Sequence, residues 1–198
     1  MTTTHLLYLH GFRSSPQSAK ARQMAALMAA DYPAVIWHCP QLPPSPRQAM
    51  QDIMTAVHDW PAKSMAAVGS SLGGFYATWV AEQMACKAVL LNPAVEPSRD
   101  LQAYIGEQTS WHDPGETFYF QPGFVDELRA LHVGPLKTPE NYFAVIAKGD
   151  EVLDWREMTA RYKNARIKLL EGGDHALCDF DQHLPDILDF LKLARQGG

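Results

Sequence analysis

The sequence predicts an α/β fold, in which a mainly parallel sheet of about six strands carries helices on both faces. Short runs rich in β-branched and aromatic residues alternate with helical patterns along the chain. Most of these runs are continuously apolar, which is typical of strands buried on both faces of a parallel sheet. The length of 198 residues, with 46% hydrophobic residues, suits a single domain. We therefore expect residues 1–198 to form one domain.

The strand pattern recurs along the whole chain. Six segments match it: His5–Leu9, Ala34–His38, Met65–Val68, Lys87–Leu91, Tyr142–Ala147 and Arg166–Leu170. Numbered along the chain, these strands are expected to lie in the spatial order 2-1-3-4-5-6. Functional residues are then expected at their carboxyl ends, where open α/β sheets bind their ligands.

Three helices have clear signatures. Ser45 and Pro46 form an N-cap and first-turn pair. The apolar residues that follow have helical spacing: Met50, Ile53, Met54 and Val57. The same spacing recurs near the end of the chain: Leu184, Ile187, Leu188 and Leu191. The segment Leu72–Ala85 is apolar almost all round, which predicts a helix covered on several sides.

The connection between the fourth and fifth strands, residues 92–141, is far longer than the others. It is rich in proline, glycine and aromatic residues, and a helix is expected near Val125–His132. Loops of this length in compact domains are usually lids or binding elements, so we expect a small lid-like insertion. The alternative is a packing insertion whose aromatic side chains form their own small core.

Charge and composition exclude several classes of function. The formal net charge is −5 and no dense Lys/Arg stripe is present, so a nucleic-acid partner is not expected. The sequence has no HExxH motif, no clustered Cys/His spacing and no EF-hand loop, so no metal is expected. Too few glycines follow the first strand for a dinucleotide site. We therefore expect no cofactor.

Cysteine usage and hydropathy indicate the compartment. Cys39, Cys86 and Cys178 include no CxxC pair, so a disulfide framework is not indicated. The first residues lack the basic region of a signal peptide. The longest uncharged stretch, Ser64–Ala81, is broken by serines and glycines, which disfavours a membrane span. We expect a cytoplasmic protein without membrane contact.

Residues 69–73, Gly-Ser-Ser-Leu-Gly, match the G-x-S-x-G pattern of a nucleophile elbow. The pattern follows a predicted strand and opens a predicted helix, which is the context that the elbow requires. Ser71 is the candidate nucleophile, and Ser70 fits the register less well. A glycine-rich turn without chemistry is the alternative.

A serine hydroxyl needs a base to take its proton and an acid to orient that base. In this strand–turn–helix context the partners follow in the chain order serine, acid, histidine. Asp150 comes directly after the fifth strand and is the expected acid, whereas its rival Asp154 is placed as the N-cap of the next helix. His175 lies in a glycine-rich loop after the sixth strand and is the expected base.

Two backbone N–H groups are expected to form an oxyanion hole. One belongs to Leu72, directly after the nucleophile, and the other to Phe12, where Gly11 allows close approach of the backbone. We interpret His10 as a residue that holds this loop by a structural hydrogen bond. Three further residues are candidate substrate contacts: Arg13, which has the alternative of a solvated surface arginine, and Trp111 and Phe124 of the insertion.

In combination, these segments resemble the small bacterial YqiA-type esterases of the α/β-hydrolase superfamily. The resemblance rests on YLHGFRSSPQSAKA near the start, PQLPPSP (40–46), VGSSLGGFYATWVA (68–81), LNPAVEP (91–97), KGDEVLDWR (148–156) and EGGDHAL (171–177). It covers most of the chain and is weakest across residues 100–139. It implies a three-layer α/β-hydrolase fold, and its matching site positions are Ser71, Asp150 and His175.

The resemblance implies hydrolysis of carboxylic esters without a cofactor, acting on small-molecule or acyl esters. Hydrolysis of acyl-CoA thioesters is the alternative within enzymes, and a comparison of matched oxygen esters and thioesters would separate the two. A hydrolase-like binding module without turnover is the alternative of another class. Covalent labelling by a fluorophosphonate would discriminate it from an enzyme.

Overall fold

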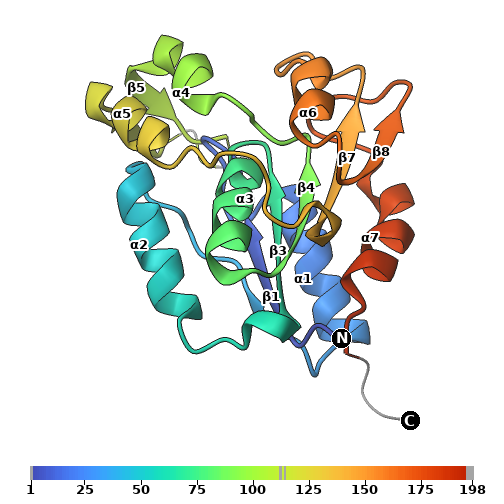
Figure 1. The fold of residues 1–198 in the computed structure, drawn as a ribbon. Coiled ribbons are helices and arrows are strands. Elements are labelled where there is room, and N and C mark those ends of the chain that lie inside the picture. Colours follow the sequence, from blue (N-terminus) through green and yellow to red (C-terminus); the bar gives the residue numbers. More distant parts are fainter. Residues whose placement is uncertain (1, 112, 114, 195–198) are drawn as a thin grey trace.

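A six-stranded parallel sheet runs through the centre of the computed structural model, which describes residues 2–111, 113 and 115–194 (Figure 1). Its strands are β1 (His5–Leu9), β2 (Ile36–His38), β3 (Met65–Ser70), β4 (Lys87–Leu91), β7 (Tyr142–Ala147) and β8 (Arg166–Leu170). They lie in the order β2-β1-β3-β4-β7-β8. This confirms the predicted order of the six strands.

Two predicted strand bounds differ from the structure. Strand β2 begins at Ile36 rather than Ala34, because the Val35 N–H donates to the Tyr32 carbonyl in the turn that follows helix α1 (Ala19–Asp31). Strand β3 continues beyond Val68 to Ser70, which pairs with Leu91 of β4. The longer β3 brings the regular backbone up to the residue before Ser71.

Helices cover both faces of the sheet, as predicted (Figure 1). Successive side chains of β1 point to opposite faces: Leu6 and Tyr8 pack with α1 and α7 (Leu184–Leu191). Leu7 and Leu9 pack on the other face. That face is covered by α2 (Pro46–Val57), α3 (Leu72–Met84) and α6 (Trp155–Arg161). The two faces form two apolar cores.

The predicted helix signatures are present. The Ser45 side chain accepts a hydrogen bond of 3.2 Å from the Gln48 N–H at the start of α2. Helix α3 is buried on most sides, as its composition indicates, and it ends one residue before Ala85. Ala85 itself takes the left-handed conformation with φ 52°. Four short 3₁₀ helices complete the described segments: Ala62–Ser64, Leu101–Tyr104, Pro139–Asn141 and Phe180–His183.

The insertion at residues 92–141 contains more regular structure than its sequence predicts. It comprises α4 (Pro97–Asp100), α5 (Pro122–Ala130) and an antiparallel hairpin of β5 (Gly106–Thr109) and β6 (Thr117–Phe120). The hairpin was not predicted, whereas α5 overlaps the expected helix near Val125–His132, beginning three residues and ending two residues earlier. These elements lie above the carboxyl ends of the main strands in Figure 1.

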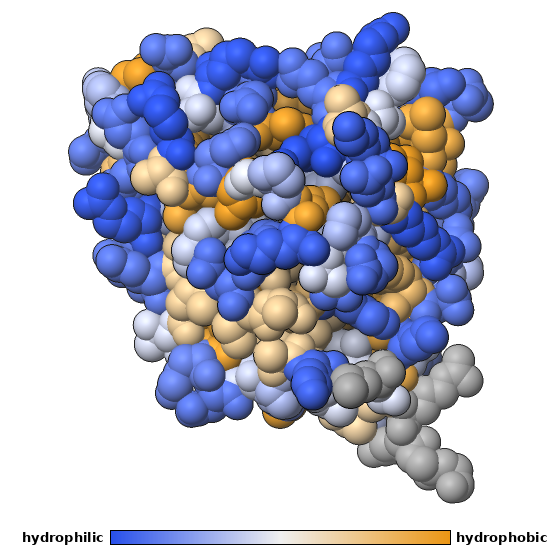
Figure 2. Space-filling model, viewed as in Figure 1, coloured by the Kyte–Doolittle hydropathy of each residue, from blue (hydrophilic) through white to orange (hydrophobic). Residues whose placement is uncertain are grey.

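The surface is mostly polar in the view of Figure 2, with apolar colours gathered toward the middle of the face. Within the described part of the chain, no helix is long and apolar enough to cross a membrane.

Candidate active site

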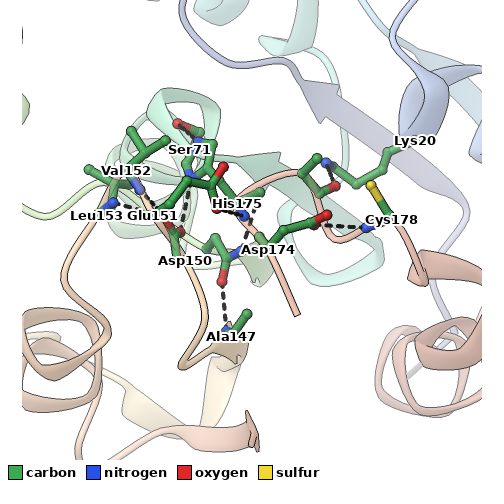
Figure 3. Close-up of polar contacts among 12 residues, drawn as sticks. Lys20, Ser71, Ala147, Asp150, Glu151, Val152, Leu153, Asp174, His175 and Cys178 are labelled. Carbon is green, nitrogen blue, oxygen red and sulfur yellow. Dashed lines mark hydrogen bonds and ion pairs between the residues drawn. The ribbon is translucent and has the colours of Figure 1, made fainter. Parts of the chain in front are cut away.

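Three polar side chains meet where β3, β7 and β8 end. Ser71 follows β3, Asp150 follows β7 and His175 lies in the loop after β8 (Figure 3). The His175 Nε2 atom lies 3.0 Å from the Ser71 Oγ atom. The His175 Nδ1 atom lies 2.8 Å from the Asp150 Oδ2 atom. The three side chains therefore form one continuous hydrogen-bonded chain.

Ser71 has a strained backbone with φ 55° and ψ −120°. Such a conformation costs on the order of 1–3 kcal/mol for a residue with a Cβ atom, so its surroundings must hold it. Its N–H donates to the Leu91 carbonyl at 3.0 Å, and its own carbonyl accepts from the N–H groups of Gly74 and Ala94. This turn lifts the Ser71 hydroxyl out of the end of β3 toward His175.

The Asp150 carboxylate is held in place by hydrogen bonds that both of its oxygen atoms make. Its Oδ1 atom accepts hydrogen bonds of 2.8 Å from the N–H groups of Val152 and Leu153, while Oδ2 contacts His175. Its side chain is 0% exposed, so these bonds replace the water that a buried carboxylate would lose. Asp154, the rival acid, instead accepts the Arg156 N–H as the N-cap of α6.

The backbone around His175 is held by residues that sequence reasoning missed. The His175 N–H donates to the Glu151 carboxylate at 3.0 Å. The side-chain amide of Asn92 donates to the carbonyls of Asp174 and His175. Lys20 of α1 donates to the Ala176 carbonyl. An asparagine directly after a predicted strand was a visible signal, but its partners are 82 and 83 positions away in the chain.

The loop after β1 runs against the nucleophile. A Cβ atom on Gly11 would lie 3.2 Å from the Ser71 Cβ atom, so the close packing here favours glycine. Leu72 is the first residue of α3, and first-turn N–H groups have no acceptor within their helix. Phe12 and Leu72 line one cavity together with Ser71 and His175.

His10 holds this loop to the neighbouring segment. Its Nε2 atom accepts a hydrogen bond of 3.0 Å from the Leu42 N–H, and its Nδ1 atom lies 3.0 Å from the Gly11 carbonyl. The side chain is buried, and both of its ring nitrogens are engaged with backbone groups. This arrangement agrees with the interpretation of His10 as a structural residue.

Two cavities open beside Ser71 and His175. The first, of about 460 Å³, is lined mostly by apolar residues of the insertion, of α3 and of the loop after β7, among them Leu72, Leu101 and Leu153, together with the charged Arg13 and Asp100. The second, of about 550 Å³, has more polar and charged residues in its lining, among them Lys20, Gln23 and Glu151, although Tyr8, Leu177 and Phe180 line it as well. We call them the apolar cavity and the polar cavity. Burial lowers the pKa of Lys20, while the nearby Asp174 carboxylate opposes that shift.

Two of the three candidate substrate contacts lie at these cavities. Trp111 lines both, and Arg13 lines the apolar one. The Arg13 guanidinium lies 4.2 Å from the centre of a Trp111 ring, and its Nε atom donates to the Thr109 carbonyl at 2.7 Å. Phe124 lines neither of these two cavities, and its ring packs against Phe120 at a centroid distance of 5.5 Å.

The insertion is joined to the Phe12 loop. The Phe12 ring makes edge-on contacts with three aromatic rings of the insertion, at centroid distances of 5.3–5.8 Å: Tyr104, Phe118 and Phe120. The backbone N–H of Trp111 donates to the Arg13 carbonyl at 2.8 Å.

Within the described residues, no group of three or more His, Cys, Asp or Glu side chains is arranged to hold a metal ion.

Comparisons with known proteins agree with this architecture. A family model described as "Uncharacterised protein family (UPF0227)" matches residues 5–192. The structure is similar to a putative hydrolase from Agrobacterium vitis S4, with a TM-score of 0.74 and 19% identity, covering 96% of this chain and 91% of that one.

Two further solved structures have the same overall shape. Alpha/beta hydrolase domain-containing protein 10 from mouse matches with a TM-score of 0.72 and 14% identity, covering 96% of this chain and 91% of that one. The metagenome-derived lipolytic enzymes LipS and LipT are represented by a match with a TM-score of 0.69 and 18% identity, covering 97% and 95% of the two chains. At these identities the likeness shows the α/β-hydrolase fold.

Proposed function

The chain belongs to the UPF0227 (YqiA-like) family and has the α/β-hydrolase fold, and from this premise we propose that it is a serine hydrolase that cleaves carboxylic esters. The names of its structural neighbours, which include a putative hydrolase and lipolytic enzymes, support a hydrolase. The observation that carries the proposal is the contact of the Ser71 hydroxyl with His175, which in turn contacts the buried Asp150 carboxylate.

In the proposed reaction, the Ser71 Oγ atom attacks the acyl carbonyl carbon as His175 Nε2 takes its proton. The Asp150 carboxylate accepts a hydrogen bond from the His175 Nδ1–H group, which fixes the tautomer and stabilises the imidazolium without moving that proton. The N–H groups of Phe12 and Leu72 bind the negative oxygen of the tetrahedral intermediate. The imidazolium then protonates the leaving alcohol. Water, activated by His175, releases the acid from Ser71.

The two cavities suit different halves of such a substrate. We assign the acyl chain to the apolar cavity, because burying a methylene group there is favourable by about 0.8 kcal/mol. We assign the alcohol to the polar cavity, where Lys20, Gln23 and Glu151 offer hydrogen bonds. The insertion then acts as a lid that sets acyl specificity. Lys20 would also suit the anionic leaving group of an acyl-CoA thioester, which is the second candidate activity.

Leu101→Trp is expected to shorten the preferred acyl chain. Leu101 lines the apolar cavity, so an indole ring there occupies the volume of several methylene groups. We expect kcat/KM for octanoyl esters to fall about tenfold or more, with acetyl esters changed less than about threefold. The measurement is a series of p-nitrophenyl esters of increasing chain length, with thioesters of matched length to compare the two candidate activities.

Leu131→Trp is the matched control for this series. Leu131 lines a separate open groove between α2 and α5, whose lining includes neither Ser71 nor His175. It is expected to leave the chain-length profile unchanged. An unchanged profile in Leu101→Trp would rule out the apolar cavity as the acyl site.

Labelling by a fluorophosphonate probe tests the proposed function itself. The probe phosphonylates a serine only when an adjacent base activates it, so we expect one label per chain, on Ser71. Peptide mapping by mass spectrometry locates the label, and heat-denatured protein is the control. No labelling of the folded protein would favour the non-catalytic binding module.

A reducing compartment is consistent with the three cysteines. Cys39, Cys86 and Cys178 are all free thiols. We propose a cytoplasmic location on this basis.

A further inference from the structure

Asn92 stands directly after β4, between the strands that carry Ser71 and Asp150. It is 0% exposed and has φ 41°, in the left-handed region where asparagine is the most tolerated residue after glycine. Its N–H donates to the Val145 carbonyl of β7 at 3.0 Å. The chain turns here, and the turn directs the Asn92 side chain toward β7 and the His175 loop.

The side-chain amide of Asn92 uses both its donor and its acceptor. Its Nδ2 atom donates to the Asp174 carbonyl at 3.0 Å and to the His175 carbonyl at 3.2 Å. Its Oδ1 atom accepts from the Ala147 N–H at 2.8 Å. Figure 3 labels Ala147, and the dashed line that ends on it marks this last bond. One buried side chain therefore bridges the last residue of β7 and the backbone that carries His175.

The two bridged segments are those whose side chains must meet. Asp150 follows Ala147 by three residues, and His175 is itself one of the bridged residues. The other side chains that hold the His175 loop, Glu151 and Lys20, are exposed and half-buried. Hydrogen bonds of a buried amide compete less with water than exposed ones do. Asn92 is therefore well placed to set the spacing between Asp150 and His175.

We propose that Asn92 is a positioning residue, which holds the His175 backbone at the distance from β7 that the contact of His175 with Asp150 and Ser71 requires. The proposal rests on the proposed serine hydrolase function. Asparagine meets three needs together: a left-handed backbone, an acceptor for the Ala147 N–H and a donor to the His175 loop. Aspartate lacks the donor and glycine lacks the side chain, so each substitution removes a defined part of the bridge.

Asn92→Asp tests the donor with little change of shape. It places a carboxylate against the two carbonyl oxygens, so the His175 loop is expected to move away. A displacement of about 1 Å costs on the order of 10²-fold in rate, so we expect kcat for p-nitrophenyl acetate to fall about 10- to 100-fold, with KM changed less than about threefold. Asn92→Gly keeps the left-handed turn and is expected to show the same split between kcat and KM.

Tyr162→Phe is the matched control for the loss of a buried hydrogen bond. The Tyr162 hydroxyl lies 2.9 Å from the Thr78 Oγ1 atom, between α3 and the end of α6, and both residues are buried. This variant is expected to lower thermal stability by an amount similar to the Asn92 variants while keeping kcat. If kcat falls in proportion to the loss of thermal stability in Asn92→Asp, Asn92→Gly and Tyr162→Phe alike, the positioning role is overturned. It is also overturned if neither Asn92 variant folds.

A second readout does not depend on activity. The His175 Nδ1 proton, hydrogen-bonded to Asp150, is expected to give a strongly deshielded proton resonance, identified by its absence in His175→Ala. We expect this resonance in the wild type and in Tyr162→Phe, and its loss or broadening in Asn92→Asp. An unchanged resonance and kcat in Asn92→Asp would overturn the positioning role. A wild type that shows the resonance but neither labelling nor hydrolysis would refute the proposed function alone.

Discussion

Ser71→Ala is expected to lower kcat/KM for p-nitrophenyl acetate on the order of 10⁴-fold or more. In the proposed reaction the Ser71 hydroxyl forms the acyl bond, and it lies 3.0 Å from the His175 Nε2 atom that takes its proton. The far-ultraviolet circular dichroism spectrum and the melting temperature are expected to match the wild type, because the change removes one oxygen atom. Steady-state hydrolysis measures the effect.

Ser70→Ala is the control that separates the two adjacent serines. Ser70 is the last residue of β3, is buried, and makes no contact with His175 that resembles the Ser71 contact. We expect it to retain most of the activity. Retained activity in Ser71→Ala, or an equal loss in Ser70→Ala, would contradict the assignment of the nucleophile.

Gly73→Ala is expected to lower the free energy of unfolding by about 3 kcal/mol or more. A Cβ atom at this position would lie 1.9 Å from the Leu9 carbonyl oxygen and 2.7 Å from that of His10. Both are backbone atoms of the strand and loop beside the nucleophile, so no side chain can rotate away. Helix α3 must move instead, and the Ser71 turn moves with it. Urea denaturation measures the loss, and hydrolysis is expected to fall too.

Gly123→Ala provides the comparison for the glycine substitution. Gly123 is in the first turn of α5, and a Cβ atom there would meet no atom within 4 Å. Alanine favours a helix over glycine by up to about 1 kcal/mol, so this variant is expected to be as stable as the wild type or slightly more stable. A Gly73→Ala protein as stable as Gly123→Ala would show that α3 does not pack closely against β1.

The main sheet could be predicted because its signals are local. Continuous apolar runs indicate buried parallel strands: four of the six match the structure at both ends, and the other two differ by two residues at one end. The hairpin of the insertion was missed because residues 106–109, Gly-Glu-Gln-Thr, have no strand pattern of their own. They become a strand through pairing with β6, whose aromatic residue Phe118 packs against Phe12.

The candidate site also contains residues that local sequence signals predict and residues that only long-range packing brings into place. Ser71, Asp150 and His175 could be proposed from the sequence because each follows a predicted strand, and the ends of parallel strands meet at one edge of a sheet. The role of Asn92 could not be proposed from the sequence, because its partners come together only when β4, β7 and the His175 loop pack. Phe124 was a candidate substrate contact as an aromatic residue of the insertion, yet it lines neither cavity and its ring packs against Phe120.

The sequence by itself therefore determined the order of the strands, the helices with clear local signatures and the three residues proposed for catalysis. Tertiary structure alone decided how the insertion folds over the site, which side chains line each cavity and what holds the His175 loop. The physical reason is the range of the interactions. Hydrophobic periodicity and turn chemistry act between neighbours in the chain, whereas the bridge through Asn92 joins residues more than fifty positions apart.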